Sequence, residues 1–107
     1  MSTKLKIMLV DDHYLVRMGL ASIIALEPDM TVCAEAATGE QALALFRVHN
    51  PDVTLIDQRL PGLTGSETTQ KIRAEYPGAR ILVLSTYACD EEIYRALHCG
   101  AMGYLSK

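Results

Sequence analysis

Several carboxylates directly follow short apolar runs of this chain. Asp11 and Asp12 follow residues 7–10, and Asp57 follows residues 53–56. Short apolar runs are typical of strands, and the carboxyl ends of parallel strands meet at one edge of a sheet. We therefore expect the three carboxylates to lie close together, where their mutual repulsion favours a bound cation.

The side chains expected around this cation indicate phosphoryl chemistry. Oxygen ligands that are too few for a dedicated protein cage suit Mg²⁺, which keeps several waters and shares phosphoryl oxygens. Ser85 and Thr86 follow the apolar run 81–84, and Lys107 follows the last short run. A lysine and a hydroxyl are the groups that the charged oxygens of a phosphoryl group require. The pattern predicts phosphoryl transfer to a carboxylate.

Composition predicts one folded domain. The 107 residues, half of them hydrophobic and 21% charged, suit a single globular core. The formal net charge is −3 and no cluster of basic residues is present, so we expect no direct nucleic-acid binding. Three cysteines without C-x-x-C spacing indicate reduced thiols. The first apolar run is too short for a signal peptide or a membrane span, which favours a cytoplasmic protein without membrane contact.

Strands and helices are predicted to alternate. The runs 7–10, 53–56 and 81–84 lack polar alternation and predict strands buried on both faces, whereas the more polar segments 30–36 and 103–106 suit the sheet edges. Thr-Gly-Glu-Gln at 38–41 and Thr-Gly-Ser-Glu at 64–67 predict capping boxes at helix starts. Apolar residues at helical spacing form three groups: Val16, Leu20, Ile23 and Ile24; Ala42, Leu45 and Phe46; Ile93, Ala96 and Leu97. This order predicts an α/β fold with a doubly wound parallel sheet.

Four segments, in order, resemble the marker segments of response-regulator receiver domains of bacterial two-component systems. They are L-V-D-D-H-Y-L-V-R-M-G-L, I-D-Q-R-L-P-G-L-T-G, L-S-T and G-A-M-G-Y-L-S-K, and the first and last resemble the NarL/FixJ (LuxR-type) subfamily in particular. Their joint occurrence is specific and covers essentially the whole chain. The resemblance implies a flavodoxin-like five-stranded sheet with strand order 2-1-3-4-5, in which Asp11 and Asp57 flank the switch point.

The resemblance also implies which residues carry out the reaction. Asp57 would be the nucleophile that becomes an aspartyl phosphate. Asp11 and Asp12 would position Mg²⁺, with Asp57 and the backbone carbonyl of Arg59 as further ligands. Lys107 would pair with Asp57 and then with the phosphoryl group.

Further positions would act after phosphorylation. Ser85 would hydrogen-bond a phosphoryl oxygen, and Tyr104 would turn inward as the switch residue. Arg59 and Tyr87 lie at the positions that tune the phosphate lifetime in the family, and both are bulky here. Pro61 and Gly65 would shape the loop after the phosphorylation site.

Simpler explanations exist for single residues. Asp11 and Asp12 could merely cap the first helix, which is an ordinary role for aspartate. Lys107 could be a solvated lysine, and the choice of Ser85 over Thr86 rests on the resemblance. The histidines have no mutual metal-ligand spacing and receive no role; they are His13, His49 and His98.

The expected function is that of a signalling receiver rather than an ordinary enzyme. It would catalyse its own phosphorylation from a sensor histidine kinase and its own dephosphorylation, and would regulate transcription through a helix-turn-helix domain outside this chain. A Mg²⁺-dependent phosphatase with an aspartyl nucleophile is the alternative, but Asp11-Asp12-His13 lacks the second aspartate two residues after the nucleophile. A degenerate receiver that only binds partners is disfavoured because all site residues are present.

The end of the chain also leads to an expectation. Lys107 directly follows the fifth predicted strand, so residues 1–107 are expected to be a receiver domain truncated before its final helix. One sheet face would then be half covered. We expect a homodimer, other self-association or marginal stability as a result.

Overall fold

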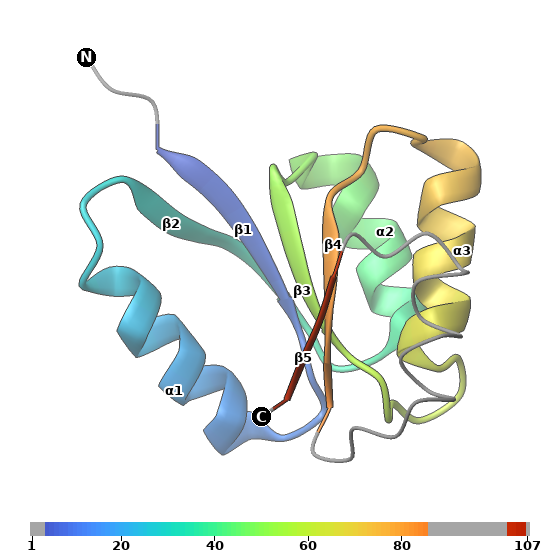
Figure 1. Cartoon of the computed structure of the whole chain (residues 1–107), viewed down its shortest axis with the longest axis horizontal. Helices are drawn as coiled ribbons and strands as arrows, with labels where there is room; N and C mark the ends of the chain where they lie inside the picture. The colour runs from blue at the N-terminus through green and yellow to red at the C-terminus, as the bar shows by residue number, and fades with distance from the viewer. Residues whose placement is uncertain (1–3, 86–102, 107) are drawn as a thin grey trace.

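A five-stranded parallel sheet organises the molecule. The computed structural model describes residues 4–85 and 103–106. Its elements are β1 (Leu5–Val10), α1 (Tyr14–Ala25), β2 (Met30–Ala36), α2 (Gly39–His49), β3 (Val53–Asp57), α3 (Gly65–Glu75), β4 (Ile81–Ser85) and β5 (Gly103–Ser106). The strands lie in the order β2-β1-β3-β4-β5, and neighbouring strands are parallel (Figure 1). The predicted fold class and strand order are confirmed.

Helices α2 and α3 cover one face of the sheet (Figure 1). Met8 and Val10 of β1 are buried on this face, in one cluster with Phe46 of α2 and Ile72 of α3. The ring of Phe46 lies 4.8 Å from that of Tyr76, measured between centroids. Among the described residues this is the larger of the two hydrophobic clusters, and it packs against β1 and β3 close to their carboxyl ends.

Helix α1 lies on the opposite face (Figure 1). Ile7 and Leu9 of β1 pack there in a cluster with Ile24. Residues 7–10 are buried on both faces, as predicted, but Val53 and Leu55 of β3 are only half-buried. The reason is that, within the described part of the chain, α1 is the element that covers this face, and it packs against β1 and β2.

The predicted buried face of α1 is partly wrong. Ile24 is buried and Leu20 packs against its cluster, but Ile23 is 63% exposed and Val16 is 36% exposed. The helix packs on the sheet through Leu20, Ala21 and Ile24, so Val16 and Ile23 lie at the margins of that stripe. Apolar spacing alone does not determine the rotation of a helix about its axis.

Helices α2 and α3 each begin after a threonine whose side chain caps the helix. Thr64 forms the complete predicted capping box, since its hydroxyl accepts from Glu67 N–H and the Glu67 carboxylate accepts from Thr64 N–H. At α2 the Thr38 hydroxyl accepts from Gln41 N–H, but the Gln41 side chain accepts from Ala37 N–H instead of Thr38 N–H. The second predicted box is therefore only half correct. The predicted helix at Ile93 lies outside the described residues.

No helix in the described part of the chain has the length and apolar character that a bilayer span requires.

Candidate metal and phosphoacceptor site

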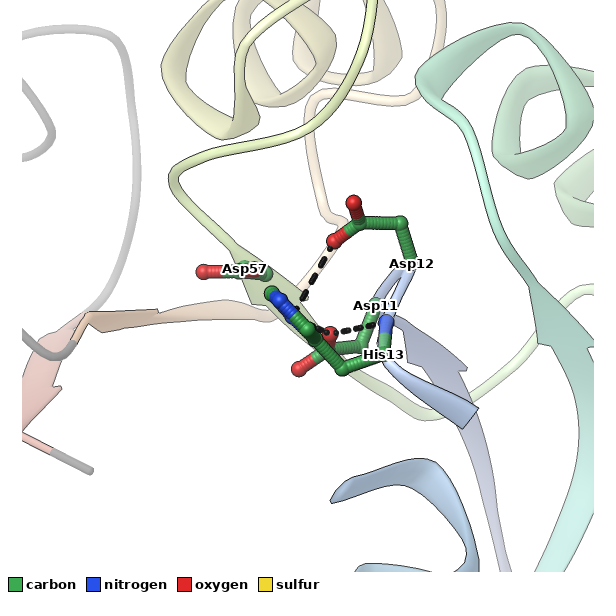
Figure 2. Close-up of side chains that lie close together, drawn as sticks. All are labelled: Asp11, Asp12, His13 and Asp57. Carbon is green, nitrogen blue, oxygen red and sulfur yellow. Dashed lines mark hydrogen bonds and ion pairs between the residues drawn. The ribbon is translucent and has the colours of Figure 1, made fainter. Parts of the chain in front are cut away.

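Three of the predicted site residues meet at the carboxyl edge of the sheet (Figure 2). Asp11 directly follows β1 and Asp57 ends β3, and these strands are neighbours. Asp11 is 2% exposed and Asp57 is 4% exposed, whereas Asp12 lies at the surface. One side-chain ligand atom of each of the three, together with one of His13, lies within 4.8 Å of the others.

His13 joins this cluster, although the sequence analysis assigned it no role. Its Nδ1 atom lies 3.1 Å from Asp11 Oδ1 and 3.2 Å from Asp12 Oδ1, and its backbone N–H donates to Asp11 Oδ1 at 2.8 Å. His13 is also the N-cap residue of α1, so neither aspartate occupies the capping position that the simpler explanation gave them. Sequence reasoning missed His13 because it compared histidines with one another, whereas the informative signal is a histidine beside two adjacent aspartates.

The loop after β3 is held by Gln58, which directly follows Asp57. The Gln58 side-chain oxygen accepts hydrogen bonds from both the N–H and the hydroxyl of Ser66, each at 2.9 Å. Its backbone carbonyl accepts from Gly65 N–H at 3.0 Å. Arg59 N–H in turn donates to Asp57 Oδ1 at 3.3 Å. The Arg59 N–H bond orients the Asp57 carboxylate, and the Gln58 bonds hold the start of α3 beside it. In the sequence, the signal was a polar residue, Gln58, directly after the buried run.

Gly65 allows α3 to begin directly against the end of β3. A Cβ atom on Gly65 would lie 2.4 Å from the carbonyl oxygen of Asp57 and 2.8 Å from the Cα atom of Gln58. Both atoms belong to the backbone and cannot rotate away. The close approach explains why a glycine stands at this position.

Arg17 of α1 braces the residue that ends β1. Its Nη1 donates to the backbone carbonyl of Asp11 at 2.6 Å, and its Nε donates to the Glu35 carboxylate of β2 at 3.2 Å. Its guanidinium carbon also lies 5.7 Å from the centre of the Tyr14 ring. Arg17 therefore ties α1 and β2 to the loop that carries Asp11, a contact that sequence spacing did not predict.

The structure places the remaining predicted site residues only in part. Ser85 is the last residue of β4, and Tyr104 lies within β5, but their side chains are outside what the structure describes. Thr86, Tyr87 and Lys107 lie outside the described residues altogether.

The donor set fits a hard divalent cation. Three carboxylates supply oxygen ligands, and Asp11 and Asp57 come from rigid strand ends that need no rearrangement to approach one another. Carboxylates this close repel, and a divalent ion offsets that repulsion. An acidic cluster beside a buried, oriented carboxylate can hold a metal ion next to a nucleophile.

Comparison with known proteins identifies the family. Residues 7–107 match the family model of the response regulator receiver domain. The chain belongs to this family. The receiver domain is 42% identical over 101 residues to the nitrate/nitrite response regulator protein NarL of Escherichia coli K12. The aligned residues cover 94% of this chain and 47% of NarL. It is 39% identical over 104 residues to the transcriptional regulatory protein DegU of Brevibacillus brevis, covering 97% and 44%. The receiver domain thus spans about half the length of these curated relatives.

Solved structures agree with this assignment. The receiver domain is similar to the signal receiver domain of NarL from Mycobacterium tuberculosis, with a TM-score of 0.93, 35% identity and coverage of 97% of this chain and 84% of that one. It is also similar to a LuxR family two-component response regulator from Aurantimonas sp. SI85-9A1, with a TM-score of 0.94, 39% identity and coverage of 98% and 75%. The predicted NarL/LuxR-type receiver domain is confirmed.

Proposed function

We propose that this receiver domain accepts a phosphoryl group on Asp57 from the phosphohistidine of a sensor histidine kinase, in a reaction that requires Mg²⁺. The observation that carries the proposal is the buried Asp57 carboxylate, which shares one cluster with Asp11 and Asp12 at the carboxyl edge of the sheet. In the transfer, a bond forms between an Asp57 oxygen and phosphorus while the bond between phosphorus and the donor nitrogen breaks.

Four groups would hold the metal ion. They are the carboxylates of Asp11, Asp12 and Asp57 and the backbone carbonyl of Arg59. When bound, Mg²⁺ neutralises negative charge on the phosphoryl oxygens during the transfer. The protein's own part is positioning: Arg17 braces the Asp11 backbone, and Arg59 N–H orients the Asp57 carboxylate.

Family membership supports further roles for residues whose side chains the structure does not describe. Lys107 pairs with Asp57 and then with the phosphoryl group, and Ser85 hydrogen-bonds a phosphoryl oxygen. Tyr104 turns inward when Ser85 moves. Tyr87, together with the exposed Arg59, affects how fast the phosphate is lost.

The names of the relatives support a transcriptional output. We infer that phosphorylation in the cytoplasm changes the contacts of this receiver domain, including contacts with a second copy, and so controls a DNA-binding segment outside these residues. NarL is a response regulator and DegU is a transcriptional regulatory protein, and the receiver domain spans about half of each.

Intact mass spectrometry with acetyl phosphate and Mg²⁺ tests the proposal. The domain should gain one phosphoryl group, which base should remove because acyl phosphates are labile. Asp57→Asn should abolish the gain, whereas Asp29→Asn, a matched change at an exposed aspartate, should not. A phosphoryl group that persists in Asp57→Asn would contradict the proposal.

A further inference from the structure

The N-cap side chain of α1 differs from those of the other two described helices. Thr38 and Thr64 each accept a hydrogen bond from a backbone N–H of their own helix. His13 makes no such side-chain cap, and Figure 2 shows its ring turned toward the carboxylates. The His13 ring is therefore engaged with the acidic cluster rather than with the helix that it begins.

The distances in the cluster suit shared coordination of one ion. His13 Nδ1 lies 3.1 Å from Asp11 Oδ1 and 3.2 Å from Asp12 Oδ1. One ligand atom from each of Asp11, Asp12, His13 and Asp57 lies within 4.8 Å of the other three. Ligands held at about 2.0–2.2 Å from a divalent ion lie roughly 3–4.4 Å from one another. The two distances from His13 to the aspartates fall in this range, and the 4.8 Å limit on the whole group lies just above it.

We propose that His13 is a nitrogen ligand that strengthens the binding of first-row transition-metal ions at this site more than it strengthens the binding of Mg²⁺. The inference rests on the proposed function, because the same carboxylates hold the metal. Mg²⁺ takes oxygen ligands and gains little from an imidazole. Transition-metal ions bind imidazole well, and their affinity rises from Mn²⁺ to Ni²⁺. His13 thus widens the difference in affinity between these ions and Mg²⁺ at the cluster.

A purely structural role makes a different prediction. If His13 only donated a hydrogen bond to Asp11 and Asp12, its loss would alter the affinity for every divalent ion by a similar factor. Asparagine at this position keeps a hydrogen-bond donor and is a good N-cap residue, but it is a poor ligand for transition-metal ions. His13→Asn therefore separates ligation from hydrogen bonding.

Calorimetric titration of the full chain with Mg²⁺, Mn²⁺ and Ni²⁺, at one fixed pH, tests the inference. His13→Asn should lower Ni²⁺ affinity by about tenfold or more, Mn²⁺ affinity by less, and Mg²⁺ affinity by under about threefold. His49→Asn, the matched change at another histidine of the described chain, should leave all three unchanged. In the parent protein, Zn²⁺, which is diamagnetic, should also shift the imidazole signals of His13, whereas Mg²⁺ should leave them nearly unchanged; this measurement requires no variant to fold.

The outcomes separate the two proposals. Equal losses for all three ions, or an unchanged Ni²⁺ affinity together with His13 signals that Zn²⁺ leaves unshifted, would overturn the role of His13. Asp11→Asn should weaken the binding of every ion. Mg²⁺ binding that is insensitive to Asp11→Asn would instead contradict the carboxylate site on which the proposed function depends.

Discussion

Replacing Gly65 with alanine would bring a Cβ atom against the backbone that carries the proposed phosphoacceptor. The new atom would lie 2.4 Å from the carbonyl oxygen of Asp57, about 1 Å closer than an ordinary van der Waals contact. The start of α3 or the end of β3 must therefore move. Both are held by the hydrogen bonds of Gln58 to Gly65 and Ser66.

The expected cost follows from two opposing effects. Overpacking of a buried site costs about 1–3 kcal/mol, whereas replacing glycine with alanine in a helix gains up to about 1 kcal/mol. The net loss in the free energy of unfolding should be about 1–2 kcal/mol. With a urea m-value of ~1.5 kcal/mol per M, the unfolding midpoint should fall by about 1 M. A displacement of Asp57 by about 1 Å should also slow its phosphorylation by roughly 100-fold.

Gly19 provides the matched control. It lies within α1, and a Cβ atom there would meet nothing within 4 Å. Gly19→Ala should therefore raise the free energy of unfolding by about 0.5–1 kcal/mol and leave phosphorylation unchanged. Urea unfolding followed by circular dichroism, with phosphorylation followed by intact mass, measures both effects. If Gly65→Ala were as stable and as active as Gly19→Ala, the steric reasoning would be refuted.

Four further changes have defined outcomes. Asp12→Ala should weaken Mg²⁺ binding about tenfold or more in calorimetry while the free energy of unfolding changes by under about 0.5 kcal/mol; a large loss of stability would indicate a structural role instead. Thr54→Val should raise stability by up to about 1 kcal/mol in urea unfolding, because the buried Thr54 hydroxyl has no hydrogen-bond partner among the described residues; a loss of stability would mean that it has one. Burial raises the pKa of the Cys33 thiol, so less of it is thiolate at neutral pH, and iodoacetamide should modify it more slowly than a free cysteine once the other two cysteines are changed to serine. If Cys33 and free cysteine reacted with iodoacetamide at equal rates, the raised thiol pKa would be contradicted. Ser85→Ala should still accept phosphate but leave the NMR signals of Tyr104 unchanged on phosphorylation, and a parent-like change would disprove the proposed switch.

Much of the fold could be read from local patterns. Apolar runs identified three strands, the more polar segments 30–36 and 103–106 gave the bounds of β2 and β5 as predicted, and the Thr64 box marked the start of α3. The approach of Asp11 to Asp57 also follows from the pattern, because parallel strands end at one edge of the sheet. The exposure of Ile23 did not follow, because helical spacing does not say which residues of an apolar stripe meet the sheet.

The sequence by itself determined which residue types stand at the strand ends, and thereby a carboxylate site of receiver type. Only the tertiary structure decided which neighbours complete it. His13 faces Asp11 and Asp12, Gln58 holds the start of α3, and Arg17 reaches the Asp11 backbone. The physical reason is that strand periodicity fixes side-chain direction within an element, whereas a loop or cap side chain takes its direction from partners that folding brings to it.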